Sequence, residues 1–285
     1  MSSMTRQSGG KLNRLDQSLP EGLLVDAAWL TRRGYSRQLQ NQYASAGWLE
    51  QPTRGVYRRP RGKLGWQQAI ISLQTILGGD PVVVGGRTAL ELQGYAHYLA
   101  TQVKEVHLYG PKRPPGWLFK LSLDVHFVMH NSGTLFATEL ARHDAGNLAL
   151  DAAKGEVRNP NFGDTTIVQS WGQWDWPLSL STPERALFEL LNELPSRESF
   201  EQVDKLFEGL TNLSPRRLVA LLADCRSVKV KRLFFFFAAR HDHAWFKRID
   251  RAKVDLGSGK RVLVKGGRLD PATQITVPED LHAIR

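Results

Sequence analysis

The pattern of apolar and polar positions is clearest near the amino-terminal end of the chain. It predicts a short helix over residues 26–33, which Gly34 ends, and a second helix that Ser36 caps. The apolar positions of the second helix follow the i, i+4, i+7 spacing of one buried stripe, at Leu39, Tyr43 and Ala46. Two helices joined by such a tight turn are typical of a helix-turn-helix.

Two short extended runs follow the second helix. They cover residues 48–51 and 55–59, and the sequence Pro52-Thr53-Arg54-Gly55 between them predicts a hairpin with a basic tip. A helix-turn-helix followed by a hairpin is the arrangement of a winged helix. The sequence therefore predicts a winged helix-turn-helix domain over residues 1–62, with residues 11–18 as its first helix.

The polar face of the second helix carries side chains that can read a DNA major groove. At about 100° per residue these side chains point away from the apolar stripe. Amide and guanidinium groups match the donors and acceptors on base edges. We therefore expect contacts to double-stranded DNA from the helix, through Ser36, Arg37, Gln38, Gln40, Asn41 and Ser45, and from the wing, through Arg54 and Arg58.

The distribution of charge along the chain favours binding to a polyanion. Residues 1–65 hold 11 Lys and Arg against 4 Asp and Glu, residues 66–195 hold 9 against 13, and residues 196–285 hold 18 against 11. The net charge of +10 is thus concentrated at the two ends, with +7 in each and −4 between them. An ordinary helical hairpin would explain the helix pattern but not this segregation of charge.

The remaining sequence predicts an α+β domain over residues 63–285. Helices are expected over residues 66–77, 87–92, 182–194, 200–206, 215–224 and 228–241. Strands are expected over residues 82–84, 103–109, 121–129, 165–170 and 178–181, and a last one over residues 256–268. The chain is long enough for two globular domains.

Composition restricts the compartment and the chemistry. Cys225 is the one cysteine, which excludes an internal disulfide and a zinc site built from several thiolates. The longest apolar run, over residues 233–239, is far shorter than the roughly 20 residues that span a bilayer. No apolar segment follows the polar amino terminus. We expect a cytoplasmic protein without a membrane segment.

Three groups of polar residues could form a catalytic or metal site. They are His241 with His243 at a helix end, Asp124 with His126 and His130 on one strand, and the loop Gly257-Ser258-Gly259-Lys260. The first group lacks further ligands, polar alternation on a half-exposed strand explains the second, and the third lacks the spacing of a phosphate loop. We predict a protein without enzymatic activity, metal or cofactor. A DNA nuclease that uses Asp124 and His126 is an alternative.

Three segments of the chain resemble the AbiEi-type antitoxins of bacterial type IV toxin–antitoxin systems. They are GWLEQPTRGVYRR, LSLSTPERALFELL and DLGSGKRVLVKGGRLDPATQITVP. The resemblance covers nearly the whole chain, and the third segment is the most distinctive because of its order of Gly, Lys and Arg. By position, Arg37, Gln38 and Asn41 match the recognition helix of the family, and Arg54 matches its wing.

The resemblance implies a transcriptional autorepressor that binds repeats in its operon promoter. Its carboxyl-terminal domain is then an antitoxin domain that counteracts a nucleotidyltransferase toxin, without a stable complex between the two being required. We add the hypothesis that the antitoxin surface is basic and consists of Lys229, Lys231, Arg232 and Arg268. A ligand-responsive winged-helix regulator is an alternative, and it predicts a pocket with converging polar groups in the β-rich middle.

Overall fold

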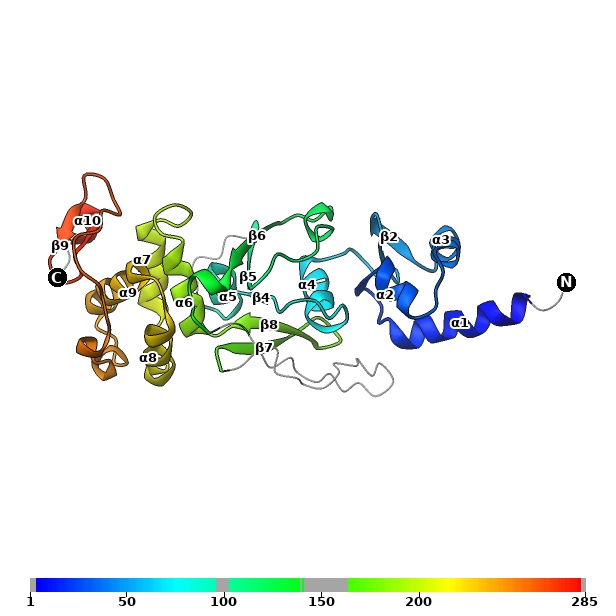
Figure 1. Cartoon of the computed structure of the whole chain (residues 1–285), viewed down its shortest axis with the longest axis horizontal. Helices are drawn as coiled ribbons and strands as arrows, with labels where there is room; N and C mark the ends of the chain where they lie inside the picture. Colours follow the sequence, from blue (N-terminus) through cyan, green and yellow to red (C-terminus); the bar gives the residue numbers. More distant parts are fainter. Residues whose placement is uncertain (1–3, 96–102, 139, 141–163, 283–285) are drawn as a thin grey trace.

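The computed structural model describes residues 4–95, 103–138, 140 and 164–282 of the 285-residue chain. The molecule is elongated, and its parts follow the chain order along the long axis (Figure 1). A small amino-terminal unit lies at one end, a five-stranded sheet lies in the middle, and a group of helices leads to the carboxyl terminus at the other end. The predicted α+β fold class is confirmed.

The amino-terminal unit is a winged helix-turn-helix. Its elements are α1 (Met4–Ser18), β1 (Leu24–Asp26), α2 (Ala27–Arg32), α3 (Arg37–Ser45), β2 (Glu50–Thr53) and β3 (Val56–Arg58). The strands form an antiparallel sheet in the order β1-β3-β2. The sequence pattern did not predict β1, because three residues are too few to show an alternation of apolar and polar positions.

Caps position the two helices of the helix-turn-helix. The Asp26 carboxylate accepts a hydrogen bond from the backbone N–H of Trp29, and the Ser36 hydroxyl accepts one from that of Leu39. Gly34 lies between the helices at φ +85°, a conformation that side chains disfavour. The predicted turn at Gly34 and the predicted cap at Ser36 therefore lie where the sequence placed them, whereas Asp26, expected as the first residue of the helix, caps it.

The middle of the chain forms a mixed sheet with the strand order β6-β5-β4-β8-β7. The β4–β8 and β5–β6 pairs are parallel, and the β4–β5 and β7–β8 pairs are antiparallel. The strands are β4 (Val83–Val84), β5 (Glu105–Gly110), β6 (His126–Asn131), β7 (Thr166–Trp171) and β8 (Trp176–Ser181), and the nearby helices are α4 (Trp66–Thr75) and α5 (Gly86–Leu92). The predicted strand over residues 121–129 begins later, because a 3-10 turn and a loop precede it.

The last part of the described chain is mainly helical. It contains α6 (Pro183–Asn192), α7 (Phe200–Gly209), α8 (Pro215–Asp224) and α9 (Val228–His241), followed by β9 (Arg268–Asp270), β10 (Ile275–Val277) and α10 (Glu279–His282). The prediction of one strand over residues 256–268 is wrong. Gly257, Gly259 and Gly266 adopt positive φ angles there, so this stretch is a loop until β9 begins.

The winged unit and the sheet share one apolar core. Leu23, Leu24 and Val56 of the winged unit belong to the same buried cluster as α4 and the sheet. The backbone N–H of Leu24 also donates to the Ser72 hydroxyl at 2.7 Å. A division of the chain at residue 62 stays a prediction, and it would cut through this continuous core. Within the described residues, no helix is long and apolar enough to cross a membrane.

Candidate nucleic-acid interface

Helix α3 presents a polar face to solvent. The Tyr43 side chain is buried in the core of the winged unit, and Leu39 packs against the same core. Five of the residues expected to contact DNA are exposed: Ser36, Arg37, Gln38, Asn41 and Ser45. Ala46, expected on the buried stripe, is exposed because the helix ends at Ser45. The exposed set therefore forms the face that α3 can offer to a groove.

Gln40 does not belong to this face, contrary to the expectation from sequence. Its side chain is 1% exposed, and its amide nitrogen donates to the backbone oxygen of Tyr35 at 2.8 Å. The same nitrogen lies within hydrogen-bond distance of the Thr31 hydroxyl and of the backbone oxygen of Ala27. Gln40 thus ties α3 to α2 and the intervening turn. It is a positioning residue for the exposed face.

The β2–β3 hairpin forms the wing, and its two arginines differ. Arg54 is exposed at the tip, beside Gly55 at φ +76°. Arg58 is 5% exposed: its Nε donates to a Glu50 carboxylate oxygen at 2.5 Å and its Nη2 to the backbone oxygen of Gly62 at 2.8 Å. The expectation that Arg58 contacts DNA is therefore corrected. Arg58 lies on the central strand of the small sheet, where its neighbours bury it.

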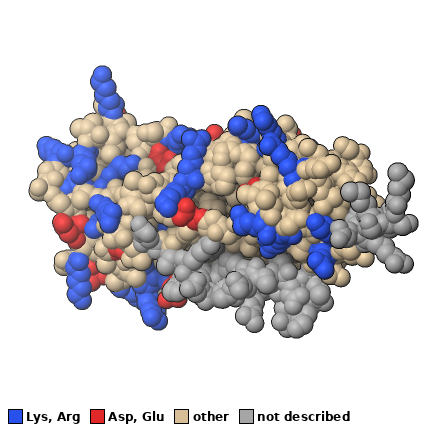
Figure 2. All heavy atoms as spheres, turned by 45° about the vertical axis from the view of Figure 1, so that its right-hand side comes forward, with Lys and Arg blue, Asp and Glu red and all other residues tan. Residues whose placement is uncertain are grey.

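Two further features of this end were missed in the sequence. Arg32 and Arg33 are exposed next to the turn that leads into α3, and the Arg33 guanidinium carbon lies 3.7 Å from the centre of the Trp29 ring. Trp48, just after α3, is 53% exposed. The sequence Arg32-Arg33-Gly34 at the end of α2 is the signal that could have identified the two arginines. Figure 2 shows that Lys and Arg side chains predominate over Asp and Glu on the face it displays.

The basic surface predicted for antitoxin action does not form as expected. Arg232 is 2% exposed, and its guanidinium donates to the backbone oxygens of Leu256, Gly259 and Gln274. The Lys229 ammonium group donates to two backbone oxygens at the end of α6, and burial lowers its pKa. Both residues hold loops in place. Lys231 is half-buried, and Arg268 is exposed.

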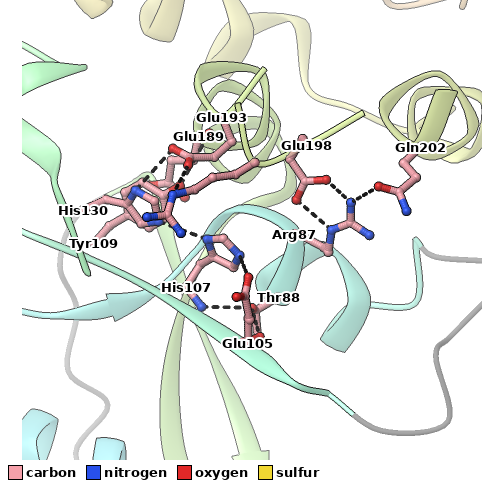
Figure 3. A network of polar contacts seen from close by, with 11 residues as sticks. Arg87, Thr88, Glu105, His107, Tyr109, His130, Glu189, Glu193, Glu198 and Gln202 are labelled. Atoms are coloured by element: carbon pink, nitrogen blue, oxygen red, sulfur yellow. Dashed lines mark hydrogen bonds and ion pairs between the residues drawn. The ribbon is translucent and has the colours of Figure 1, made fainter. Parts of the chain in front are cut away.

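A buried polar network joins the sheet to α6 (Figure 3). The Nδ1 of His107 lies 3.0 Å from the Nε2 of His130, whose Nδ1 lies 3.2 Å from a Glu193 carboxylate oxygen. The Tyr109 ring stacks on the His130 ring with 4.5 Å between centres. Glu189 accepts hydrogen bonds from the backbone N–H of Gly86, the Ser181 hydroxyl and the Arg185 guanidinium.

Of the group expected on one strand, His126 and His130 both lie on β6 but Asp124 does not, and the three side chains are not brought together. Asp124 precedes β6 and pairs with Lys63 at 2.5 Å, His126 is exposed, and His130 belongs to the buried network. His241 pairs with Asp204 at 2.7 Å at the other end of the molecule. In the described ranges, no group of three or more His, Cys, Asp and Glu could hold a metal ion.

Burial controls the ionisation of the network. Burial lowers the pKa of His107 to about 4, and the neighbouring His130 adds to this effect. Burial also raises the pKa of Glu189, although Arg185 opposes the rise. Burial alone would raise the pKa of Glu193, but its hydrogen bond from His130 and the positive charges around it together outweigh burial and lower the pKa. The network therefore holds a neutral imidazole at His107 at neutral pH.

This ionisation predicts how stability depends on pH. An unfolded chain protonates His107 near pH 6.5, whereas the folded chain protonates it only near pH 4. Acidification from pH 7 to pH 4 should therefore destabilise the wild type relative to His107→Gln by about 3 kcal/mol. Urea unfolding of both proteins across this range measures the difference. The exposed His126→Gln variant is the control, and curves for His107→Gln that stay parallel to the wild type would contradict the assignment.

Comparisons with known proteins agree with this architecture. A sequence model described as "Transcriptional regulator, AbiEi antitoxin N-terminal domain" matches residues 8–101, and one described as "Transcriptional regulator, AbiEi antitoxin, Type IV TA system" matches residues 103–278. The two matches meet beyond the boundary predicted at residue 62. No curated protein matches the chain.

A solved structure supports the fold independently. The crystal structure of the RV2827C protein from Mycobacterium tuberculosis is similar, with a TM-score of 0.54 and 17% sequence identity over 95% of this chain and 89% of that chain. At this identity the similarity shows the fold alone. The sequence matches, in contrast, cover most of the chain and confirm the resemblance seen in its segments. The chain belongs to the AbiEi antitoxin family of transcriptional regulators of type IV toxin–antitoxin systems.

Proposed function

We propose that the protein is a cytoplasmic repressor of its own operon that binds promoter DNA through α3 and the β2–β3 wing. In this proposal it acts by binding and not by catalysis, and its carboxyl-terminal part counteracts a nucleotidyltransferase toxin. The observation that carries the proposal is the exposed face of Arg37, Gln38 and Asn41 on a helix that the buried Gln40 holds in place. Family membership supplies the regulatory and antitoxin roles.

The dimensions and chemistry of α3 suit a major groove. Its nine residues make a rod of about 13 Å, close to the groove width of about 12 Å. Arg37 can donate two hydrogen bonds to a guanine edge, and Asn41 or Gln38 can pair with an adenine edge. Arg32 and Arg33 add positive charge at the start of α3, where phosphates flank the groove.

Base reading by α3 predicts a loss that depends on DNA sequence. Arg37→Ala or Asn41→Ala should weaken binding to the operon promoter by about 1–3 kcal/mol and change binding to random DNA little, since only the promoter offers the matching base edges. Fluorescence anisotropy with both DNAs measures this. Lys265→Ala, at an exposed cation far along the chain, is the control. Equal losses on the two DNAs would contradict base reading.

The wing should instead contribute binding that does not depend on DNA sequence but does depend on salt concentration. Arg54→Ala should weaken binding to all DNA sequences. It should also reduce the slope of the logarithm of the binding constant against the logarithm of the salt concentration by about one unit, because one phosphate contact is lost. Arg58→Ala is the matched comparison in the same hairpin. It should lower the stability of the wing and leave the slope unchanged, because Arg58 is bound to Glu50 and Gly62. Equal slopes for the wild type and Arg54→Ala would show that the wing tip does not contact phosphate.

For antitoxin action we propose the exposed cations around Arg268 in place of the predicted set of four. Lys260, Lys265 and Arg268 are exposed in the glycine-rich segment that Arg232 holds. Positive charge in a fixed loop can compete for anionic substrates of a toxin. Because Lys229 and Arg232 are structural, reversal of their charge would test folding and not function.

This proposal predicts a loss of protection in cells. A Lys265→Glu/Arg268→Glu variant should fail to rescue the growth of cells that express the cognate toxin, at unchanged protein level and circular dichroism. A Lys120→Glu/Arg216→Glu variant, with the same change of charge at other exposed positions, should still rescue growth. Full rescue by the first variant would reject the basic loop as the antitoxin surface.

A further inference from the structure

A cavity opens at the carboxyl ends of two parallel strands. Its volume is about 650 Å³, and its lining includes Gly110 and Asn131, the last residues of β5 and β6. The two strands are parallel and pair in register up to these residues. Ligands of α/β proteins frequently bind outside the carboxyl ends of parallel strands. The volume is within the usual range for a small-molecule site, about 300–1,000 Å³.

The charged side chains of the lining are all cationic. Lys112, Arg113 and Arg197 line the cavity, all three are exposed, and no Asp or Glu is among the lining residues. Two carboxylates outside the lining pair with two of these cations: Asp80 is 3.4 Å from the Lys112 ammonium group, and Glu193 is 3.7 Å from the Arg197 guanidinium. They balance part of the charge but leave a net positive cavity. Guanidinium groups of this kind bind phosphate with paired hydrogen bonds.

The remaining wall is apolar and aromatic. The rings of Phe119 and Phe127 lie at 90° with 6.4 Å between centres, and Met129 lines the cavity beside them. The Arg113 guanidinium carbon lies 4.6 Å from the centre of the Phe119 ring. Both rings are half-buried, so part of their surface faces the cavity. Such a wall accepts a planar base by stacking.

We propose that this cavity binds a free nucleoside polyphosphate. The phosphates lie on Lys112, Arg113 and Arg197, and the base lies against Phe119 and Phe127. An inorganic phosphate would leave the aromatic wall uncovered, and an apolar ligand would leave the net positive charge of the lining unbalanced. A nucleotide satisfies both parts of the lining, and Asn131 can add a hydrogen bond to its sugar or base.

This site goes beyond the proposed DNA binding and does not depend on it. It lies in the β-rich middle of the chain, where the alternative of a ligand-responsive regulator predicted a pocket. The position of the cavity also separates it from α3 and the wing along the chain. Nucleotide binding and promoter binding can therefore be tested with different variants.

The test is calorimetric titration of the full-length protein with ATP and with GTP at 150 mM salt. We expect a dissociation constant below 1 mM for at least one of them, at a stoichiometry of one. Arg113→Gln and Arg197→Gln should each weaken binding at least fivefold. Arg216→Gln removes an exposed cation of α8 outside the cavity and should leave binding unchanged. Equal weakening by all three variants would overturn the site, because it would show attraction to overall charge.

Two further titrations test the aromatic wall and distinguish a free nucleotide from an RNA strand. Phe127→Leu should weaken ATP binding at least threefold and leave the binding of inorganic pyrophosphate unchanged, because only the nucleotide uses the aromatic wall. Circular dichroism and thermal unfolding verify that the variant is folded. A single-stranded RNA dodecamer that binds the same residues while ATP and GTP do not would overturn the proposal in favour of an RNA strand. No binding of any nucleotide up to 5 mM would overturn it outright.

Discussion

The arrangement of the molecule depends on helix α4, which is buried between the winged unit and the sheet. Two polar side chains that are two residues apart, and so point to opposite sides of this helix, hold the two sides together. The Ser72 hydroxyl accepts from the backbone N–H of Leu24 in β1, and the Gln74 amide exchanges hydrogen bonds with Ser179 in β8 and donates to Val82. Buried backbone groups that lose such partners cost about 1–3 kcal/mol each. These contacts therefore specify how α4 lies against both sheets.

Within the winged unit, the orientation of α3 depends on one buried amide. Gln40 donates to acceptors on α2 and on the turn after it, so α3 cannot rotate without leaving these acceptors unsatisfied. Apolar contacts of Tyr43 alone would permit sliding, because they lack direction. The directed bonds of Gln40 keep Arg37 and Asn41 on the outer face. A residue that does not contact DNA thus determines which residues can.

Much of the fold was predictable because its elements are defined by local signals. Ser, Pro and periodic Leu or Phe mark α8 and α9, and their predicted and observed limits agree. The burial of Gln40, Arg58 and Arg232 was not predictable. Each is a long polar side chain that donates to at least one backbone oxygen, and a sequence does not show where such backbone oxygens lie in the fold. The same limit applies to the cavity, because its lining comes from two strands, a turn and the segment after α6.

The cavity and the buried network are connected through one carboxylate. Glu193 lies 3.2 Å from His130 through one oxygen and 3.7 Å from Arg197 through the other, and Arg197 also lines the cavity. The positive charge of Arg197 is among the causes that lower the pKa of Glu193. A phosphate bound to Arg197 would offset that charge and so weaken one of the causes that hold the pKa of Glu193 low. Glu193 also pairs with His130, so binding in the cavity would change a contact that joins the end of α6 to β6. This contact is a physical route by which a ligand in the cavity could affect the packing of the neighbouring elements.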